Sequence, residues 1–399
     1  MKMSQIIPSL HDASQGREAL SRIEESKIRE VANAGMGLSD VLAFWFGEPD
    51  QVTPDLIRNA AKQALDSGAT FYTQNLGIPA LREAIARYVS RLHRGVNANQ
   101  IAVTSSGVNA LMLAYQALFD PGDRVVIITP VWPNVTEGPK IVGAAVTRVP
   151  LHYAQGWKLD LARLLAALTP ATRAVIINSP NNPTGWSMDR ASQQIVLDHC
   201  RKLGIWIIAD DVYERLYFSD SSSVAPSFLD ICNADDLVVS TNSFSKSWLM
   251  TGWRLGWIVA PPLLTEQFAK LIEYNTSCAP SFVQQAGIVA LEQGATITQE
   301  FLQRLHTARD FLVGELNTLP GIHVAAPPGA MYVFLGVDGM TDSVSFAKQL
   351  VTTARLGLAP GVAFGPEGEG YLRWCFASSV ARLAEGIERL KTGLHAVRR

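Results

Sequence analysis

The chain has 399 residues, of which 48% are hydrophobic and 18% are charged. A chain of this length and composition can bury a large core, and we expect about two or three packed units. Its formal net charge is -2, with both signs interspersed. It therefore offers neither the basic field that nucleic acids require nor a polybasic stripe for a membrane surface, and a small-molecule partner is favoured.

The cysteines and the N-terminal segment indicate the compartment. The four cysteines are scattered, with no paired spacing for a zinc site and no dense disulfide framework: Cys200, Cys232, Cys278 and Cys375. The first thirty residues contain several acidic side chains and lack the apolar core of a signal peptide. No later run approaches the roughly 20 apolar residues that span a bilayer. We expect a cytoplasmic protein without a metal site, a membrane partner or a nucleic-acid partner.

The first strongly predicted element is a helix in "PALREAIARYVSRLHRG", residues 79–95. Its proline suits a first helical turn, and its apolar residues form one stripe, which predicts a helix docked on a core. The residues of the stripe are Leu81, Ile85, Tyr88, Val89 and Leu92.

Between Gln100 and Pro261, short apolar runs rich in β-branched residues predict strands. They are "QIAVTSSG", "RVVIITP", "RAVIINSP", "IWIIADD", "LVVSTNS" and "LGWIVAP". Most are continuous rather than alternating, which is typical of strands buried on both faces. Helical stretches such as "VNALMLAYQAL" and "RASQQIVLDHCRKLG" separate several of them. The pattern predicts a mainly parallel sheet covered by helices, with ligands gathered beyond the carboxyl ends of the strands. A long helical pattern, "TITQEFLQRLHTARDFLVGELNTLPG", then leads into a second, smaller domain.

Several of these strands end in polar residues that a core does not need. Each group has a purely structural explanation when taken alone, as a helix cap, a turn or a solvated side chain. Their shared location at one edge of one sheet favours a binding site instead. The groups are Asp210 and Asp211, the segment 181–185 ("NNPTG"), Ser243 with Ser245 and Lys246, and Ser105 with Ser106 and Gly107.

One ligand can satisfy these groups together. The helix start at Gly107, with the hydroxyls of Ser243 and Ser245 and the guanidinium of Arg254, suits a phosphate dianion. A carboxylate at a buried strand end, as at Asp210, is costly unless a cation or a protonated ring nitrogen faces it. A lysine among other cations has its ammonium form disfavoured and can act as an amine nucleophile. Pyridoxal phosphate carries the phosphate, the protonatable ring and the carbonyl that these groups require.

The motifs "SFSKSWLMTGWRLGW", "NSPNNPTG", "ADDVYE", "GEPD" and "YTQNLGIPALREAIARY" resemble those of class I/II aminotransferases, pyridoxal phosphate enzymes of fold type I. The resemblance covers residues from about 26 to 373. It implies an α/β fold with a mainly parallel seven-stranded sheet in a large domain, plus a smaller α/β domain. The domain boundaries that we predict are an N-terminal segment, 1–48, that joins the small domain, a large cofactor-binding domain, 49–294, and a small C-terminal domain, 295–399.

The resemblance also implies roles for individual residues. Lys246 forms the Schiff base with the cofactor, Asp210 keeps the ring nitrogen protonated, and Tyr213 with Asn182 contacts the phenolic oxygen of the ring. The remaining expected contacts of the cofactor are Ser106, Gly107, Val108, Ser243, Ser245 and Arg254 around the phosphate, Trp132 on the ring face, and Tyr72 from the other subunit of a homodimer. Trp132 has a structural explanation too, as a core or turn tryptophan.

Arg373 is a candidate on independent grounds. In "GYLRWCFAS" the alternation of a strand places Leu372 and Trp374 on one face and Arg373 on the other, so that Arg373 faces a cleft. Its planar guanidinium suits a carboxylate, and the resemblance assigns it to the α-carboxylate of the amino acid, with Gly47 and Asn182 also at the substrate. An exposed strand arginine is the structural alternative.

We therefore expect a homodimeric aminotransferase with shared active sites, which moves an amino group between an α-amino acid and a 2-oxo acid by a ping-pong mechanism. A carbon–sulfur β-lyase of the same fold would use the same lysine and carboxylate-binding arginine. A regulatory pyridoxal phosphate-binding module is a third hypothesis, but no basic helix-turn-helix-like extension accompanies the motifs. The aromatic run Phe44, Trp45 and Phe46 before "GEPD" suggests either apolar substrate side chains or simple packing.

Overall fold

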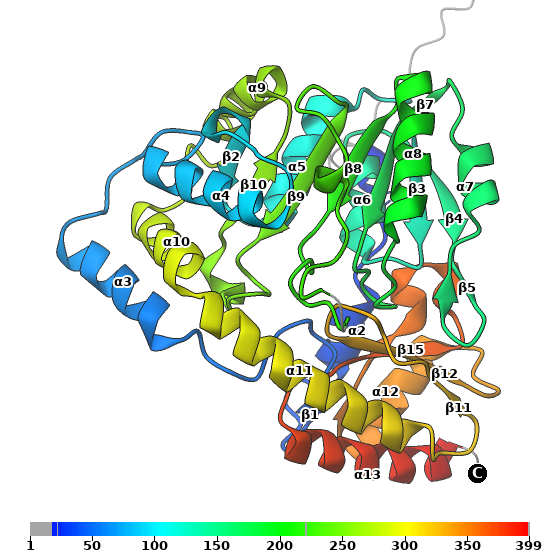
Figure 1. The fold of residues 1–399 in the computed structure, drawn as a ribbon. Helices are drawn as coiled ribbons and strands as arrows, with labels where there is room; N and C mark the ends of the chain where they lie inside the picture. The colour runs from blue at the N-terminus through cyan, green and yellow to red at the C-terminus, as the bar shows by residue number, and fades with distance from the viewer. Residues whose placement is uncertain (1–17, 22, 220–221, 398–399) are drawn as a thin grey trace, which may run out of the picture.

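We describe a computed structural model of the chain, in which residues 18–21, 23–219 and 222–397 are described. A seven-stranded sheet and a four-stranded sheet lie at the centres of two layered units (Figure 1). The helices are α1 (Glu18–Ser21), α2 (Lys27–Ala34), α3 (Asp55–Asp66), α4 (Pro79–Leu92), α5 (Gly107–Leu118), α6 (Pro133–Ile141), α7 (Leu161–Ala167), α8 (Arg190–Leu203), α9 (Pro262–Glu273), α10 (Ser281–Gln293), α11 (Ala295–Leu316), α12 (Ser343–Ala354) and α13 (Val380–Val397).

The large sheet has the strand order β2-β10-β9-β8-β7-β3-β4. Its strands are β2 (Ile101–Thr104), β3 (Arg124–Thr129), β4 (Ala145–Pro150), β7 (Thr172–Asn178), β8 (Trp206–Asp210), β9 (Val238–Ser243) and β10 (Gly256–Val259). Only β10 runs antiparallel to its two neighbours, while the other pairs are parallel. The six predicted strands are confirmed, and β4 completes the sheet at one edge.

Helices cover both faces of this sheet, as its continuous apolar strands require. On one face, α5, α6 and α9 pack on side chains such as Val125, Ile176 and Ile208. On the other face, α4, α7, α8 and α10 pack on the alternate positions, including Val126 and Ile207. The predicted stripe of α4 is buried at four of its five positions and Leu92 is partly buried.

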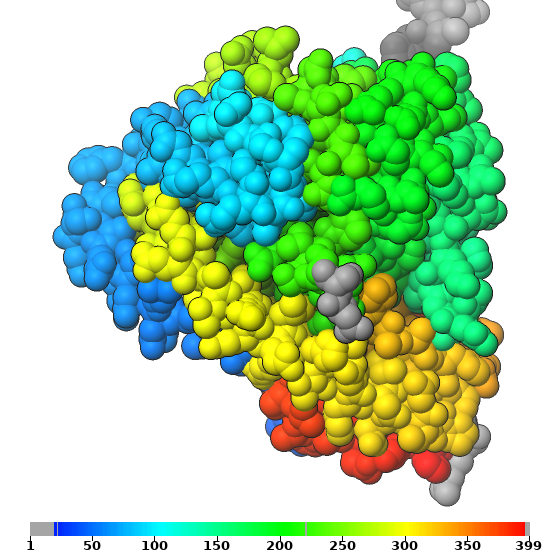
Figure 2. All heavy atoms as spheres, in the orientation of Figure 1, coloured from blue at the N-terminus to red at the C-terminus, as the bar shows by residue number. Residues whose placement is uncertain are grey.

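The small sheet has the order β11-β12-β15-β14 and is antiparallel throughout. Its strands are β11 (Ile322–His323), β12 (Tyr332–Val337), β14 (Ala359–Pro360) and β15 (Tyr371–Cys375), and two-residue strands pair β1 (Leu42–Ala43) with β13 (Leu356–Gly357) and β5 (His152–Tyr153) with β6 (Trp157–Lys158). One core joins these strands to α11, α12 and α13. Helices α10 and α11 together form the yellow band on the surface in Figure 2.

The N-terminal helix α2 packs on the small unit although it is far from it in sequence. Ile28 and Val31 of α2 belong to the core of the small unit, and the ammonium of Lys348 in α12 lies 2.7 Å from a carboxylate oxygen of Glu30. The side chain of Ser26 caps this helix by accepting a hydrogen bond from the backbone N–H of Arg29. Among the described helices, none has both the length and the apolar composition needed to cross a membrane.

Candidate active site

A cavity of about 640 Å³ lies at the carboxyl ends of β7, β8 and β9. The first residues of α5, the N-terminus of α2 and strand β15 complete its wall. Predicted site residues that line the cavity are Gly47, Gly107, Val108, Trp132, Asn182, Asp210, Tyr213, Ser243, Ser245, Lys246, Arg254 and Arg373. The topology thus brings together groups that are up to 326 residues apart in the sequence, from Gly47 to Arg373.

Lys246 follows β9 and reaches into this cavity. Its ammonium nitrogen donates a short hydrogen bond to the backbone carbonyl of Gly47 and lies 6.0 Å from the ring centre of Tyr213. Burial lowers the pKa of Lys246 to about 8, and the positive charges of Arg373 and Arg254 contribute to the shift. About a tenth of the side chain is therefore a free amine at pH 7, far more than for an exposed lysine, and the free amine is the form that a nucleophile or a general base requires.

Asp210 is a buried carboxyl group at the end of β8, with a residue exposure of 5%. The amide nitrogen of Asn178 donates to its Oδ2 over 3.2 Å, and within the described residues it forms no ion pair. Burial and the neighbouring charge of Asp211 raise the pKa of Asp210 to about 7. A cationic ring nitrogen facing this carboxyl group would stabilise its charged form.

Tyr213 and Asn182 lie on the same cavity wall but have different partners. The hydroxyl oxygens of Tyr213 and Tyr332 are 2.8 Å apart, whereas Asn182 Oδ1 accepts a hydrogen bond of 3.1 Å from Nη1 of Arg373. Burial raises the pKa of Tyr213 well above its usual value. The Tyr213 hydroxyl is therefore protonated at neutral pH and can donate to an oxygen in the cavity.

The start of α5 forms a cradle with the segment after β9. A Cβ on Gly107 would lie 3.0 Å from Cβ of Ser243, so a glycine lets the helix terminus approach this strand closely. The hydroxyl oxygens of Ser243 and Ser245 are 2.9 Å apart, and Arg254 lines the same region. Backbone N–H groups at a helix N-terminus, hydroxyls and a guanidinium form a donor set that suits a phosphate.

Arg373 is 2% exposed and carries its guanidinium into the cavity from β15. It donates to Asn182 and to the backbone carbonyl of Trp45, and it lies over the rings of Tyr332 and Phe364 at 4.5 and 4.9 Å. Its buried Nε has no hydrogen-bond partner among the described residues. A buried donor without a partner is costly, and a ligand carboxylate would supply the acceptor.

Two predicted residues do not line the cavity. Ser106 lies directly before α5 and is 5% exposed, and its hydroxyl accepts a hydrogen bond of 3.0 Å from the backbone N–H of Asn109. In this chain its side chain therefore caps the helix. Tyr72 lies between α3 and α4, is 88% exposed and is not among the residues that line the cavity. Trp132 does line the cavity, and its backbone N–H donates to the carbonyl of Asn182 over 2.8 Å.

The cavity also contains residues that the sequence interpretation did not single out. Tyr332 binds Tyr213, Asn178 binds Asp210, and Arg29 lies 5.3 Å from the ring centre of Phe46. Asn178 is a polar residue at the end of a predicted strand, and this position could have identified it as a site residue. Tyr332 and Arg29 come from elements whose place at the cavity depends on the packing of the small unit, which the local pattern does not give.

The three aromatic residues before "GEPD" have different surroundings: one packs in the core and two line the cavity. Phe44 is 3% exposed and packs on Trp374, with ring centres 5.0 Å apart. Trp45 and Phe46 line the cavity. The packing explanation therefore holds for Phe44.

Comparisons with known proteins agree with this fold and site. The sequence model described as "Aminotransferase class I and II" matches residues 39–390. An aspartate aminotransferase from Pyrococcus horikoshii is 36% identical over 381 residues, with 94% of this chain and 96% of that relative covered. An aromatic-amino-acid aminotransferase from Thermococcus litoralis is 30% identical, with coverages of 94% and 97%. The crystal structure of an aspartate aminotransferase from Thermotoga maritima superposes with a TM-score of 0.89 at 32% identity, covering 95% of this chain and 100% of that one.

A lysine, a buried carboxylate and a phosphate cradle in one cavity of an α/β fold of type I define a pyridoxal phosphate enzyme. The chain belongs to the class I and II aminotransferase family, and it is a pyridoxal phosphate-dependent aminotransferase. The residues present fit the cofactor: the buried carboxyl group of Asp210 forms no ion pair among the described residues, and Gly107 lets the α5 terminus approach Ser243 closely where a Cβ would intrude. The reported relatives are named as aminotransferases, which favours transamination over the β-lyase considered from the sequence.

Proposed function

We propose that this aminotransferase uses Lys246 as its proton-transfer base, Asp210 as the partner of the cofactor ring and Arg373 as the partner of the substrate α-carboxylate. The observation that carries the proposal is the meeting of these three side chains in one cavity. They supply an amine with its pKa near 8, a buried carboxyl group that forms no ion pair among the described residues, and a guanidinium whose Nε has no hydrogen-bond partner among them.

The same cavity suggests which residues hold the cofactor. Gly107, Val108, Ser243, Ser245 and Arg254 would hold its phosphate, and the side chain of Ser106 would support them by capping α5. Asp210, Tyr213, Asn182 and Trp132 would surround its ring, with Lys246 at its aldehyde. When bound, pyridoxal phosphate supplies an electron-withdrawing ring that accepts the electron pair left at Cα of the amino acid.

The protein's own groups then control proton movement and orientation. Lys246 Nζ takes the Cα proton of the bound amino acid and later releases it, because a free amine is available near neutral pH. Arg373 fixes the α-carboxylate, so the Cα–H bond is directed toward Lys246 in each half of the ping-pong cycle. The hydroxyl of Tyr213, held by Tyr332, would donate a hydrogen bond to the phenolic oxygen of the cofactor ring.

The rest of the cavity favours amino donors with apolar or aromatic side chains. Ile28, Phe46, Val108 and Leu111 line it beyond the groups already assigned. Arg29, which lies over Phe46, is the one lining cation among the described residues that has no role in these assignments. A preference for dicarboxylic donors would require Arg29 to bind the distal carboxylate.

We propose a homodimer in which Tyr72 reaches the phosphate of the partner subunit's site. Large aromatic side chains are exposed near Tyr72: Phe71 is 82% and Tyr274 is 92% exposed. The two segments lie together, since the side chain of Asn75 donates to the carbonyl of Ser277 over 3.0 Å. Exposed apolar groups of this size favour a protein interface. Asn275 also accepts a hydrogen bond of 3.2 Å from Asn109 of α5, so these exposed aromatic groups lie on the side of the molecule where α5 begins.

We further propose a large cofactor-binding domain, residues 49–294, and a small C-terminal domain, residues 295–399, which the N-terminal segment, residues 1–48, joins. The packing of α2 against α12 supports the assignment of the N-terminal segment to the small unit. We also propose a cytoplasmic location, because all four cysteines are free, as a reducing compartment favours.

A half-reaction screen tests the function. Each amino acid is added to the purified holoenzyme, and the cofactor absorbance is followed for conversion of its aldehyde to the amine. We expect conversion with aromatic and large apolar amino acids, and Arg29→Ala should leave it unchanged. Conversion by aspartate that is lost in Arg29→Ala would instead assign Arg29 to a distal carboxylate. Release of pyruvate and ammonia from cysteine conjugates, without amine formation, would refute the aminotransferase.

A further inference from the structure

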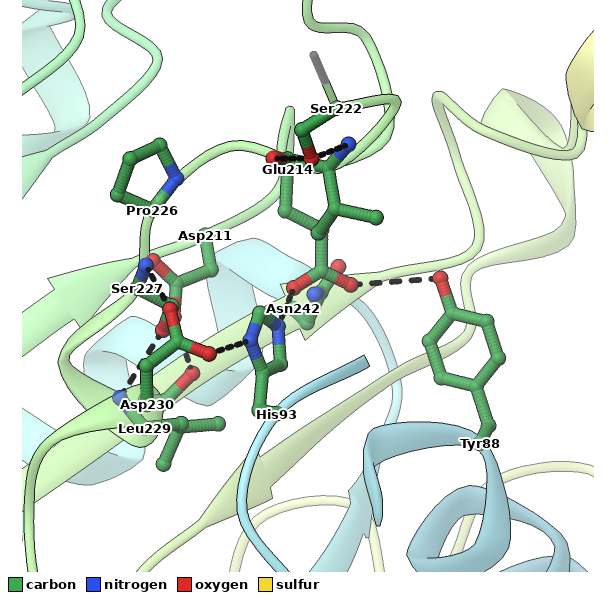
Figure 3. A network of polar contacts seen from close by, with 12 residues as sticks. Tyr88, His93, Asp211, Glu214, Ser222, Pro226, Ser227, Leu229, Asp230 and Asn242 are labelled. Atoms are coloured by element: carbon green, nitrogen blue, oxygen red, sulfur yellow. Dashed lines mark hydrogen bonds and ion pairs between the residues drawn. The ribbon is translucent and has the colours of Figure 1, made fainter. Parts of the chain in front are cut away.

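A buried cluster of charged groups lies behind the turn that carries Asp210 and Tyr213 (Figure 3). The residues at 210 and 213 line the cavity, whereas Asp211 and Glu214 do not. Both of these carboxylates are buried, with residue exposures of 3% and 4%. The turn thus presents two groups to the cofactor site and two groups to the interior on its other side.

His93, at the end of α4, closes this cluster. Its Nε2 lies 3.0 Å from Oε2 of Glu214, and its Nδ1 lies 2.7 Å from Oδ1 of Asp230, so the ring is held between two carboxylates. The side chain is 1% exposed. Figure 3 shows the ring pointing from α4 toward both acids, with Tyr88 of α4 reaching Glu214 from the other side over 3.3 Å.

The contacts continue to the residue beside Asp210. The backbone N–H of Ser227 donates to Asp230 over 2.9 Å, and the Ser227 hydroxyl donates to Oδ2 of Asp211 over 3.0 Å. Ser240 of β9 donates to the same oxygen over 2.7 Å. The backbone N–H of Glu214 closes the turn on the carbonyl of Asp211 over 2.9 Å. A displacement of Glu214 or Asp211 would therefore move the backbone that holds Asp210 and Tyr213.

The charges of the cluster require a positive ring. Burial disfavours the charged form of His93, but the hydrogen bonds to Asp230 and Glu214 raise the pKa of His93 to about 10. Burial and the charge of Glu214 raise the pKa of Asp211 to about 7. The acidic groups around His93 are Glu214, Asp230 and Asp211. The other titratable or charged groups near it are Tyr88 and Arg94 on the α4 side, Arg190 on the far side of Asp230, and Arg215 beside Tyr88.

We propose that His93 is a positioning residue, which holds Glu214 and Asp230 and thereby fixes the turn that presents Asp210 and Tyr213 to the cofactor. The proposal rests on the proposed function of those two residues. His93 touches neither the cavity nor the substrate, so its effect passes through the backbone of the turn and through its positive charge. Removal of that charge leaves the negative field of Glu214 and Asp230 less compensated at the cofactor site.

Two variants with opposite changes of charge test the proposal. His93→Gln removes the positive charge and keeps one donor, while Glu214→Gln removes a negative charge and keeps the hydrogen bonds to His93 and Tyr88. The readout is the pH midpoint of the bound cofactor's absorbance in the holoenzyme. We expect this midpoint to shift upward in His93→Gln and downward in Glu214→Gln, by roughly 0.3 to 1 pH unit, as for the loss of one nearby buried charge.

Kinetics and a control complete the experiment. We expect kcat of His93→Gln to fall by roughly 3- to 30-fold with little change of KM for the amino acid, because orientation rather than carboxylate binding is lost. Arg190→Ala is the control, since Arg190 contacts the outer oxygen of Asp230 and its side chain is 51% exposed. It should leave midpoint and kcat unchanged.

The outcomes separate the possible roles. Unchanged midpoints in both glutamine variants, with only a lower melting temperature, would overturn the proposal and make the cluster purely structural. If His93→Gln does not fold, the downward shift in Glu214→Gln decides alone. A parent enzyme without the cofactor absorbance would refute the proposed function instead, and this result is visible before any variant is made.

Discussion

Nη1 of Arg373 donates to Oδ1 of Asn182 over 3.1 Å, which joins strand β15 of the small sheet to the loop that follows β7 of the large sheet. The guanidinium is thus held at both Nη atoms, by Asn182 and by the backbone carbonyl of Trp45, while its buried Nε has no partner among the described residues. Because the planar group is fixed in this way, the orientation of its remaining N–H donors is defined before a carboxylate binds.

The first prediction follows from this contact. Arg373→Lys should raise KM for the amino acid by roughly 10- to 100-fold, because a lysine keeps the charge and loses the fork of donors that orients the carboxylate. Steady-state kinetics with a saturating 2-oxo acid measures the change. Arg382→Lys is a matched control, since Arg382 also lies over an aromatic ring, Phe44 at 5.4 Å, outside the cavity. Equal KM values in the parent and Arg373→Lys would contradict the assignment.

A second prediction concerns the covalent attachment of the cofactor. Lys246→Ala should abolish it and still bind pyridoxal phosphate, because Ser243, Ser245 and Arg254 remain at the phosphate. Borohydride reduction followed by peptide mass spectrometry should find the adduct on Lys246 in the parent and none in the variant. Lys270→Ala, at an exposed position of α9, should keep the adduct. An adduct on any other lysine of the parent would remove Lys246 from its role.

A third prediction uses the pKa of Asp210 in the enzyme without cofactor. The pKa is raised to about 7, so between about pH 4 and pH 7 the folded chain retains a proton that the unfolded chain releases. The folded state therefore loses stability as the pH rises through this window. Asp210→Asn lacks this titration. The free energy of unfolding of the variant, relative to that of the parent, should therefore rise by about 1–4 kcal/mol between about pH 4.5 and about pH 7.5.

Urea unfolding of the two proteins at both pH values measures this gain. Asp235→Asn, at an exposed position, should follow the parent. In the holoenzyme, the same Asp210→Asn variant should slow Cα proton removal far more than it weakens cofactor binding, because the ring nitrogen loses its anionic partner. A constant stability difference across the two pH values would show that Asp210 does not retain a proton in the folded chain.

The sequence predicted the large sheet and most of the site because both depend on local signals. Continuous β-branched runs identify buried strands, and polar residues at their ends, such as Asp210 and Ser243, meet wherever the strands are parallel. The contact of Tyr332 with Tyr213 joins residues 119 positions apart on separate sheets, so no local pattern gives it. The same holds for His93. The sequence of its helix predicts only an amphipathic helix, and the contact of His93 with Glu214 forms because the loop after β8 packs against the end of that helix.

For Tyr72, the sequence motif predicts a role that the structure of the single chain does not show. An aromatic residue that is 88% exposed in the single chain has no partner that its own packing explains, and the motif "YTQNLGIPALREAIARY" assigned it to the other subunit. Burial in one chain therefore cannot test the role that the sequence assigned to it. A test requires two different chains in one molecule.

The last prediction is a complementation between two inactive or weakened chains. Lys246→Ala carries an intact Tyr72, and Tyr72→Phe carries an intact Lys246. In a heterodimer with shared sites, Lys246 of the second chain meets Tyr72 of the first, so one of the two sites is native at both positions. If each Tyr72 served its own chain, neither site would be native.

Tyr72→Phe alone should weaken the hold on the phosphate by about 1 kcal/mol, and by up to about 3 kcal/mol if the acceptor is charged and few other donors compensate. The heterodimer, purified with two different affinity tags, should therefore show higher activity per Lys246-bearing chain than the Tyr72→Phe homodimer at limiting cofactor. A wild-type chain paired with Lys246→Ala sets the upper reference, because it has one native site whichever way Tyr72 is donated. Activity of the heterodimer no higher than that of the Tyr72→Phe homodimer would contradict cross-subunit donation, since the native pair of Lys246 and Tyr72 would then never have formed.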